Sequence, residues 1–239
     1  MTLEYKHIDV VILCGGAGKR LRGVVNGRPK PMVEINGTPF LDILINYVAG
    51  YGFQRFILCT GYLSDVIKNH YQGKEGAIRI VFSKEEEALG TGGAIKNAES
   101  FLQSKLFLVL NGDSFCKVDL RDFLSFHTRR KAAISIALTT IERPLDYGVV
   151  KLNEDQQIIS FNEKTSMNGT NLVNAGVYIF GRTVLSQMPS GKKFSLEYDF
   201  FPDILGKGIY GYATSERLLD IGTPERLEQA RQYFLLSSK

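Results

Sequence analysis

The sequence of 239 residues is poor in the residue types that build many familiar functional sites. It contains no tryptophan, three cysteines and three histidines. The cysteines include no C-x-x-C pair, and His7, His70 and His127 show no ligand spacing. Zinc sites and Ser-His or Cys-His hydrolase sites therefore lose their main support. The chemistry of this chain must come from its carboxylates, cations and glycines.

Long apolar runs and long basic blocks are absent as well. No stretch approaches the ~18 apolar residues that a membrane-crossing helix needs, and Met1–His7 lacks the apolar segment of a signal peptide. Arg129–Lys131 is typical of a solvated helix end rather than a nucleic-acid tract. Because Cys14, Cys59 and Cys116 are scattered in or beside apolar runs, we expect buried, reduced thiols. The sequence thus predicts a cytoplasmic protein that binds neither membranes nor nucleic acid.

The first half of the chain alternates apolar runs with amphipathic stretches. For the whole chain, a hydrophobic content of 44% supports a substantial core, and a net charge of +4 suits an anionic small substrate. Strands are expected at Val10–Leu13, Arg55–Thr60, Ile78–Phe82 and Leu106–Leu110. Helices are expected at 38–51, with Thr38 as N-cap and Pro39 as first helical residue, and at 64–71, 92–101 and 119–130. This alternation predicts a mostly parallel sheet with helices on both faces.

The second half has a different pattern, with strands that follow one another. Strands are expected at Ala133–Leu138, Gly148–Leu152, Ile158–Phe161 and Asn174–Phe180. Asn153–Asp155 is a hairpin turn signal, and helices are expected at 198–205 and 223–235. No linker separates the two halves, and the sequence shows no internal repeat. We predict one domain, 1–239, with a nucleotide-binding α/β half at 1–130 and a more mixed half at 131–239.

The stretch Leu13–Arg20 carries the strongest single indication of function. After a short apolar strand come three glycines and two cations, Gly15, Gly16, Gly18, Lys19 and Arg20. Bare N–H groups in such a loop bind anions, and open α/β sheets bind ligands where their strands end; an ordinary turn is the alternative. The dinucleotide fingerprint fails because Leu21 holds its third glycine position, and the P-loop fails because Arg20 holds its hydroxyl position.

Two further segments favour a phosphate-binding cleft. Lys30 lies between Pro29 and Pro31, which stiffen the backbone. We interpret it as a second anchor for a polyphosphate, with a rigid surface turn as the alternative. A second glycine-rich loop, Leu89–Ile95, opens a helix whose N-terminus offers N–H groups and a positive dipole end. Either loop alone fits a tight turn, but two loops after strands of one sheet predict a shared cleft.

Two aspartates each leave an apolar run. Asp113 ends the run that contains Asn111 and Gly112, and Asp220 stands just before a Thr-Pro helix start. Mg²⁺ prefers a few carboxylates together with phosphate oxygens and waters, so these two could share one ion. A lone aspartate at such a position is more often a turn former or a helix cap. The sequence alone does not establish that the two meet.

These residues together resemble the sugar-1-phosphate nucleotidyltransferase family over nearly the whole chain. No single landmark is specific, but their number and order are. The landmarks are Gly15–Leu21, Pro29–Met32, Leu89–Ala94, Asn111–Asp113, Glu163-Lys164, Asn174–Gly176 and Asp220–Pro224. Lys19 departs from many members, which carry threonine there. The resemblance implies a single Rossmann-like (GT-A-like) α/β domain, with a mostly parallel central sheet, helices on both faces and a smaller mixed β lobe for the sugar phosphate.

The resemblance also implies the reaction. A sugar 1-phosphate oxygen attacks the α-phosphorus of a nucleoside triphosphate, pyrophosphate leaves, and Mg²⁺ is the cofactor. Within the family, 31–40 and Phe194–Glu197 look most like heptose 1-phosphate guanylyltransferases. That implies GTP, D-glycero-α-D-manno-heptose 1-phosphate and a role in surface polysaccharide biosynthesis. Glucose-1-phosphate cytidylyltransferases and other hexose-1-phosphate nucleotidyltransferases are alternatives, as is a non-catalytic sugar-nucleotide-binding regulatory subunit. A homodimer is left open.

The resemblance assigns roles to individual residues. Arg20 and Lys30 contact the α-phosphate and leaving pyrophosphate, Asp113 and Asp220 hold Mg²⁺, and Lys164 neutralises the sugar phosphate. The nucleotide is also bordered by Leu13, Gly15, Gly16, Gly18, Lys19, Gly90, Thr91, Gly92, Gly93, Asn111 and Gly112. The sugar is bordered by Tyr147, Gly148, Glu163, Lys164, Asn174, Ala175 and Gly176. Segment 83–88 is expected to help read the base because it adjoins the second glycine loop.

Overall fold

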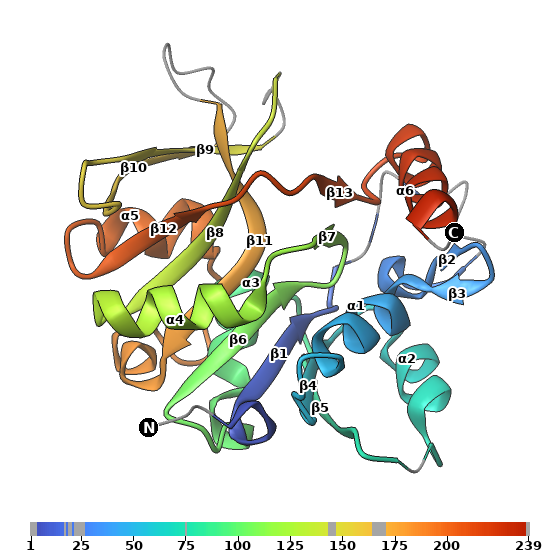
Figure 1. Cartoon of the computed structure of the whole chain (residues 1–239). Helices are drawn as coiled ribbons and strands as arrows, with labels where there is room; N and C mark the ends of the chain where they lie inside the picture. Colours follow the sequence, from blue (N-terminus) through green and yellow to red (C-terminus); the bar gives the residue numbers. More distant parts are fainter. Residues whose placement is uncertain are drawn as a thin grey trace.

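The structure is a computed structural model that describes residues 4–16, 18, 21, 27–74, 76–142, 147–163 and 171–237. For residues 162, 163 and 237 it describes the backbone alone. The described residues form a nine-stranded sheet with helices packed along it (Figure 1). Two small two-stranded sheets lie beside it.

The first half of the chain builds the parallel part of this sheet. β1 (Asp9–Leu13) lies between β4 (Arg55–Thr60) and β6 (Leu106–Asn111), and β5 (Arg79–Lys84) follows β4 at the edge. All three pairings are parallel. The prediction of a mostly parallel sheet built from strand–helix–strand units is therefore confirmed for this half, and the carboxyl ends of the four strands meet at one edge.

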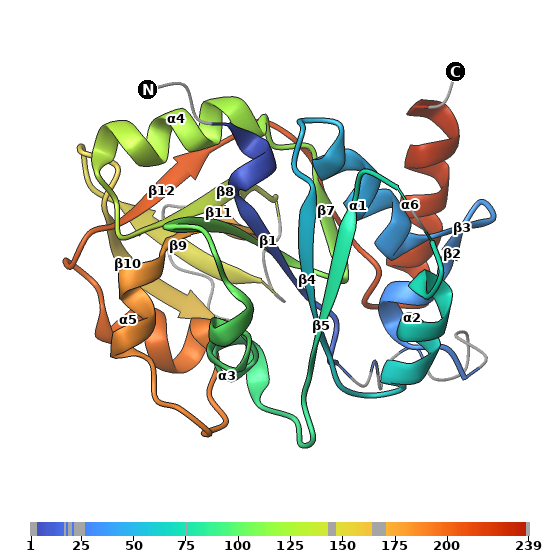
Figure 2. The same ribbon diagram turned by 90° about the horizontal axis from the view of Figure 1, so that it is seen from below.

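Helices cover both faces of the parallel strands (Figure 2). α1 (Phe40–Ala49) packs on one face and α3 (Gly90–Asn97) on the other. Successive side chains of a strand point to opposite faces. Val10 and Ile12 therefore join the core that contains α1, whereas Val11 joins the core that contains α3. Burial on both faces explains why these strands are continuously apolar in the sequence.

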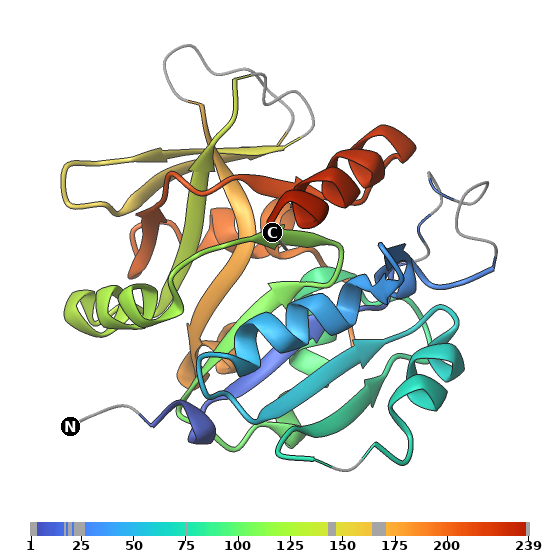
Figure 3. The same ribbon diagram turned by 45° about the vertical axis from the view of Figure 1, so that its right-hand side comes forward.

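The second half extends the same sheet with mostly antiparallel strands (Figure 3). β11 (Leu172–Gly181) pairs antiparallel with β6 and so joins the two halves. β8 (Ile134–Thr140) and β9 (Gly148–Leu152) both pair with β11. β10 (Ile158–Glu163) pairs with β9, and β12 (Ile209–Ala213) runs parallel to β8. The expected mixed β character of this half is confirmed.

The other expected helices are present with small changes at their ends. They are α2 (Ser64–Tyr71), α4 (Leu120–Arg130) and α6 (Pro224–Ser237), and 3₁₀ turns occur at η1 (Tyr5–His7), η4 (Glu99–Phe101) and η5 (Arg182–Gln187). The Asp119 carboxylate caps α4, because it accepts hydrogen bonds from the N–H groups of Arg121 and Asp122. α6 packs beside β2 (Glu34–Ile35), as Figure 1 shows.

The expected helix start at Thr38 and Pro39 is wrong. These residues form β3 (Thr38–Pro39), which pairs with β2 (Glu34–Ile35) in a short hairpin. Asn36 and Gly37 between the strands both have positive φ, 51° and 87°. That is the backbone of an Asn-Gly hairpin turn. The turn keeps Pro39 extended, so α1 begins one residue later without a side-chain cap.

Four further elements depart from expectation. Instead of a continuous helix at 198–205, a π-helical turn, η6 (Leu196–Phe200), leads into the short α5 (Phe201–Asp203). β7 (Ser114–Cys116) and β13 (Leu218–Asp220) form a small antiparallel ladder that the sequence pattern did not predict. Three-residue strands are too short to show a period, so only tertiary pairing defines them.

The cysteines are buried and free, as expected. Burial raises the pKa of all three thiols above its ordinary value, so they remain protonated. No described helix combines the length and the apolar character that crossing a membrane requires.

His127 makes the stability of the fold depend on pH. It is buried in α4, where its Nδ1 lies 2.9 Å from Ser135 Oγ, and burial lowers its pKa from 6.5 to about 4. An unfolded chain therefore binds this proton first on acidification, so stability falls as the pH drops below the unfolded pKa. From about pH 6.5 to about pH 4 we expect His127 to remove about 3 kcal/mol of unfolding free energy. Urea unfolding at several pH values measures this.

The control for that prediction is a histidine outside the core. His127→Gln is expected to lose this part of the pH dependence, whereas exposed His7→Gln keeps it. Identical acid slopes in all three proteins would contradict the assignment.

Candidate active site

A cavity of about 640 Å³ opens where the four parallel strands end. The end of β1, the loops after β4 and β5, the end of β6, η3 (Lys30–Met32) and the start of α3 supply its wall. Residues expected from the sequence that line it are Leu13, Gly15, Gly16, Lys30, Gly90, Thr91, Asn111 and Asp113. Ligands of open α/β sheets bind at this edge. The structure thus brings parts of both glycine loops and the first aspartate to one cavity.

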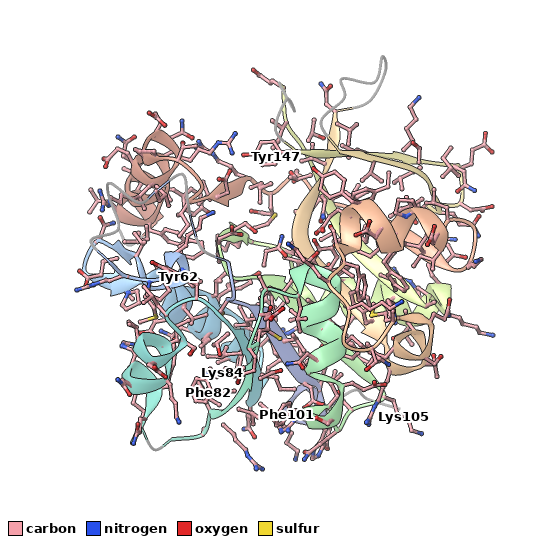
Figure 4. All side chains as sticks on the ribbon, turned by 180° about the vertical axis from the view of Figure 1, so that it is seen from behind. Tyr62, Phe82, Lys84, Phe101, Lys105 and Tyr147 are labelled. Carbon is pink, nitrogen blue, oxygen red and sulfur yellow. The ribbon has the colours of Figure 1, made fainter. Side chains whose placement is uncertain are left out.

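Gly15 lies in close contact with the Glu85 side chain and with the loop after β4. A Cβ on Gly15 would lie 2.6 Å from Glu85 Oε1, and a Cβ on Gly61 would lie 3.2 Å from the Gly15 carbonyl oxygen. The backbone N–H of Tyr62 donates to that same carbonyl at 3.4 Å. Tyr62, labelled in Figure 4, comes from the loop between β4 and α2 and also lines the cavity. The first glycine loop therefore lies flat against the loop after β4.

Glu85 places a buried carboxylate in the cavity wall. It follows β5 directly, and its Oε2 accepts a hydrogen bond from the Leu89 N–H at 2.9 Å. Burial raises the pKa of this carboxyl, and the Leu89 N–H offsets part of that rise. The sequence pointed to segment 83–88 without singling out this residue. Glu85 belongs to a run of three glutamates, a pattern that is typical of a solvated, charged segment.

Lys30 forms an ion pair with Asp113 in the cavity. The distance from Lys30 Nζ to Asp113 Oδ2 is 2.6 Å, and the lysine side chain is only 13% exposed against 44% for the aspartate. Lys30 opens the 3₁₀ turn η3 and follows extended Pro29. A Cβ on Gly18, whose φ is +56°, would lie 3.2 Å from Lys30 Cβ. The backbone thus aims this cation at the site, as the two flanking prolines predict.

The β7–β13 ladder brings the two predicted metal-binding aspartates together. Asp220 stands opposite Ser114, and the Ile221 N–H donates to the Asp113 carbonyl oxygen at 3.0 Å. Two residues that are far apart in the sequence thus become neighbours on adjacent backbones. This is the juxtaposition that the sequence could suggest but not establish.

Asp220 is held by three groups. The Tyr147 hydroxyl donates to Oδ2, the Gly222 N–H donates to Oδ1 at 2.8 Å, and Arg226 Nη1 lies 3.2 Å from Oδ2. The Arg226 guanidinium also lies 5.0 Å from the centre of the Tyr147 ring. Tyr147, labelled in Figure 4, precedes β9. Sequence reasoning missed Arg226, since a cation in the first turn of a helix has no distinguishing pattern.

The two aspartates fit a Mg²⁺ ion that takes its other ligands from phosphate and water. Mg²⁺ typically uses one or two carboxylates in such sites. Within the described residues, no cluster of three or more His, Cys, Asp or Glu is placed to hold a metal ion. Asp113 lines the cavity and Asp220 stands on the neighbouring strand, so an ion held by both would take its remaining ligands from phosphate and water.

The start of α3 is less open than the sequence suggests. The N–H groups of Gly92 and Gly93 both donate to the Phe194 carbonyl oxygen, at 3.1 and 3.3 Å. A Cβ on Gly92 would lie 2.1 Å from the Phe194 ring, so this glycine is needed for close packing. Gly90 and Thr91 line the cavity, whereas Gly92 and Gly93 are not among its described lining. The expectation of unoccupied N–H donors is therefore wrong for these two groups.

The predicted sugar residues that the structure describes lie on or directly beside β9, β10 and β11. Gly148 begins β9, and Asn174, Ala175 and Gly176 belong to β11. A Cβ on Gly176 would lie 2.9 Å from Asn111 Nδ2, so this strand packs directly against a cavity residue. Gly112 packs close to the Leu13 carbonyl oxygen and to Cys14. Lys19, Arg20, Lys164 and the side chain of Glu163 lie outside the described residues.

Comparison with known proteins gives consistent results. The chain matches the Nucleotidyl transferase family model over residues 9–236. It is 36% identical to the D-glycero-alpha-D-manno-heptose 1-phosphate guanylyltransferase of Aneurinibacillus thermoaerophilus, covering 94% of this chain and 97% of that protein. It is also 36% identical to the mannose-1-phosphate guanylyltransferase of Mycobacterium tuberculosis, over 92% of this chain but only 62% of that longer protein.

A solved structure shares both fold and sequence. The crystal structure of HddC from Yersinia pseudotuberculosis aligns with a TM-score of 0.84 at 36% identity, covering 95% of this chain and 99% of that one. The same protein complexed with GMP-PN aligns with a TM-score of 0.82. The relatives are thus sugar-1-phosphate guanylyltransferases, and the α/β fold of this chain is the nucleotidyltransferase fold.

Proposed function

We propose that this chain, which belongs to the nucleotidyl transferase family, transfers a nucleoside monophosphate from a nucleoside triphosphate to a sugar 1-phosphate. GTP is the proposed donor and D-glycero-α-D-manno-heptose 1-phosphate the proposed acceptor, in line with the relatives. The products are a GDP-sugar and pyrophosphate. The observation that carries the proposal is the Lys30–Asp113 ion pair in a cavity bordered by both glycine loops, with Asp220 on the strand that pairs beside Asp113.

The proposed reaction needs position and charge rather than a protein base. A phosphate oxygen of the sugar 1-phosphate, already an anion, forms a bond to the α-phosphorus, and the bond from that phosphorus to the β-phosphate oxygen breaks. Pyrophosphate leaves with the electron pair. Lys30 and Arg20 neutralise the triphosphate, and Lys164 neutralises the incoming sugar phosphate. Mg²⁺ bound by Asp113 and Asp220 would supply Lewis-acid stabilisation of the developing charge.

Glu85 favours guanine among the bases. Guanine carries N–H donors on two adjacent ring positions, and an ionised carboxylate, which only accepts, satisfies both at once. Adenine lacks this donor pair. Glu85 stands in the cavity wall against Gly15 with one oxygen already oriented by the Leu89 N–H. The carboxylate is thus fixed at the place where the nucleotide loop would bring a base.

Removing the charge of Glu85 is expected to weaken the binding of GTP selectively. Glu85→Gln removes one acceptor oxygen and places an N–H donor of the glutamine amide against an N–H donor of guanine. KM for GTP should therefore rise roughly 10- to 100-fold, with little change for CTP. Steady-state pyrophosphate release with each nucleotide measures this. Glu87→Gln, a change in the same cavity wall, is the matched control and should resemble the wild type. Equal effects of both substitutions would contradict base recognition by Glu85.

The function itself is tested by a substrate matrix. Four nucleoside triphosphates are paired with hexose and heptose 1-phosphates, and pyrophosphate release is measured in Mg²⁺. GTP with the heptose 1-phosphate should give the highest kcat/KM. A preference for CTP with glucose 1-phosphate would support the cytidylyltransferase alternative instead. Nucleotide binding without pyrophosphate release from any pair would identify a regulatory subunit and overturn the proposal.

A further inference from the structure

A chain of side-chain hydrogen bonds links the start of α3 to β11 behind the cavity. It runs from Thr91 through Glu197 and Tyr178 to Asn174. Thr91 lines the cavity and Tyr178 is fully buried. Glu197 comes from the π-helical turn η6, an irregularity that occurs frequently at functional sites. The proposed mechanism uses neither Glu197 nor Tyr178.

The backbone fixes the direction of each bond at the Asn174 end. An N–H group only donates, so the Asn174 atom that lies 2.9 Å from the Gly176 N–H is the amide oxygen. The amide nitrogen then faces the Tyr178 hydroxyl at 2.8 Å, and that hydroxyl accepts. Tyr178 must therefore direct its single hydrogen to Glu197 Oε1, 3.2 Å away.

Two more hydroxyls are directed at Glu197 in the same way. The Leu196 N–H donates to Thr91 Oγ1 at 2.8 Å, and the Glu197 N–H donates to Ser195 Oγ at 3.1 Å. Each hydroxyl keeps its own hydrogen for Glu197 Oε2, which lies 2.8 Å from both. Three hydroxyl hydrogens thus converge on one carboxylate, which accepts only. A glutamine of the same shape would place its own N–H donor against one of these three hydroxyl hydrogens.

The surroundings hold this arrangement in place. Burial, with the neighbouring Glu197 charge, raises the pKa of Tyr178 well above its ordinary value, so the hydroxyl keeps its hydrogen. The Tyr178 ring packs against Phe180 and Phe201, which fixes its position. Asn111 lies beside this site. Its Oδ1 is buried and has no partner among the described residues, although Asn111 lines the cavity.

We infer that Glu197 is a positioning residue that acts through Tyr178 to fix the Asn174 amide, leaving its second N–H for a sugar hydroxyl. The Asn111 oxygen, which is unpaired among the described residues, is a second polar group of the same region and can accept a hydrogen bond. A sugar hydroxyl both donates and accepts, so an amide N–H and an amide oxygen suit it. The identity of the sugar rests on the proposed function; the orientation of Asn174 rests on the contacts alone.

Kinetics distinguish this positioning role from a structural one. Tyr178→Phe keeps the ring and removes the hydroxyl that links Glu197 to Asn174, so KM for the sugar 1-phosphate should rise about tenfold, the equivalent of one lost hydrogen bond. KM for GTP should change less than about twofold. Glu197→Gln should raise the sugar KM at least as much. The double variant should not raise the sugar KM above that of Glu197→Gln, because both substitutions interrupt the same chain of hydrogen bonds.

Asp199, two residues after Glu197 in the sequence, offers a matched control. Asp199 lies in the same π-helical turn, where its Oδ2 accepts the Ser195 N–H at 2.7 Å, but it lies outside the hydrogen-bond chain. Asp199→Asn should leave both KM values unchanged even if it lowers the melting temperature. Wild-type KM values in Tyr178→Phe, or the same KM changes in Asp199→Asn, would overturn the inference.

A second readout is independent of the proposed reaction. Proton–nitrogen correlation spectra show the side-chain amide of Asn174, which Asn174→Asp identifies by removing its signals. Tyr178→Phe and Glu197→Gln should shift these signals, and Asp199→Asn should not. Unshifted signals in both would overturn the inference in an active enzyme. Shifted signals in a protein that releases no pyrophosphate from any substrate pair would reject the proposed function and keep the positioning role.

Discussion

Replacing Asp113 by asparagine is expected to lower kcat about 10²- to 10³-fold, the usual cost of losing one pre-organised charge contact. Two observations support an effect of this size. The Asp113 carboxylate forms an ion pair with Lys30 at 2.6 Å. The Asp113 carbonyl oxygen accepts a hydrogen bond from the Ile221 N–H, directly after Asp220. Asparagine keeps the shape of the side chain but removes the charge that both Lys30 and the proposed Mg²⁺ need. Pyrophosphate release at saturating substrates measures the loss.

The control for Asp113→Asn uses an aspartate with a structural role in the same part of the chain. Asp119 caps α4, and asparagine caps helices about as well as aspartate. Asp119→Asn should therefore keep both turnover and melting temperature. Since Asp113 is 44% exposed, its own replacement should leave the fold intact. A folded Asp113→Asn protein with more than half of the wild-type turnover would remove this residue from the mechanism.

Replacing Lys30 by methionine is expected to have two effects of opposite sign. Turnover should fall about 10²-fold, because the triphosphate loses an aimed cation. The affinity of the nucleotide-free protein for Mn²⁺, used as a spectroscopic probe for Mg²⁺, should rise about tenfold, or about 1.4 kcal/mol. The Lys30 ammonium lies 2.6 Å from an Asp113 oxygen, and a divalent cation would compete for that carboxylate. Electron paramagnetic resonance of free Mn²⁺ follows the binding.

Lys193→Met provides the matched charge change. Lys193 lines the same cavity, and its ammonium is not the one that pairs with Asp113. This variant should change Mn²⁺ affinity much less than Lys30→Met does. If both substitutions raise the affinity equally, the effect is one of net charge in the cavity. If Lys30→Met binds Mn²⁺ no better than the wild type, Lys30 does not compete for the metal carboxylate.

Buried strands and capped helices could be predicted from the sequence because their signals are local. β4 and β9 have the bounds that their apolar runs indicate, and Asp119 caps α4 as its position before an amphipathic stretch suggests. The Thr-Pro pair at 38–39 misled because it also fits the end of a hairpin. The preceding Asn36-Gly37 pair is the better signal there, since an Asn-Gly turn requires strands on both sides.

The parts of the site that could not be predicted depend on long-range pairing. Asp113 and Asp220 meet only because two three-residue strands form a ladder. Glu85 is one of three consecutive glutamates, and only the fold shows which of them is buried against Gly15. The N–H groups of Gly92 and Gly93 bind Phe194, a contact between distant segments. In each case the residue type was visible in the sequence but its partner was not.

The measurement that tests the central claim most directly follows the oxygen atoms of the sugar phosphate. A sugar 1-phosphate labelled with heavy oxygen throughout its phosphate is incubated with GTP and Mg²⁺, and the products are resolved by mass spectrometry. Attack of that phosphate on the α-phosphorus predicts that the whole label remains in the GDP-sugar and that the released pyrophosphate carries none. Label in pyrophosphate or in free phosphate, or GTP recovered intact, would contradict the account.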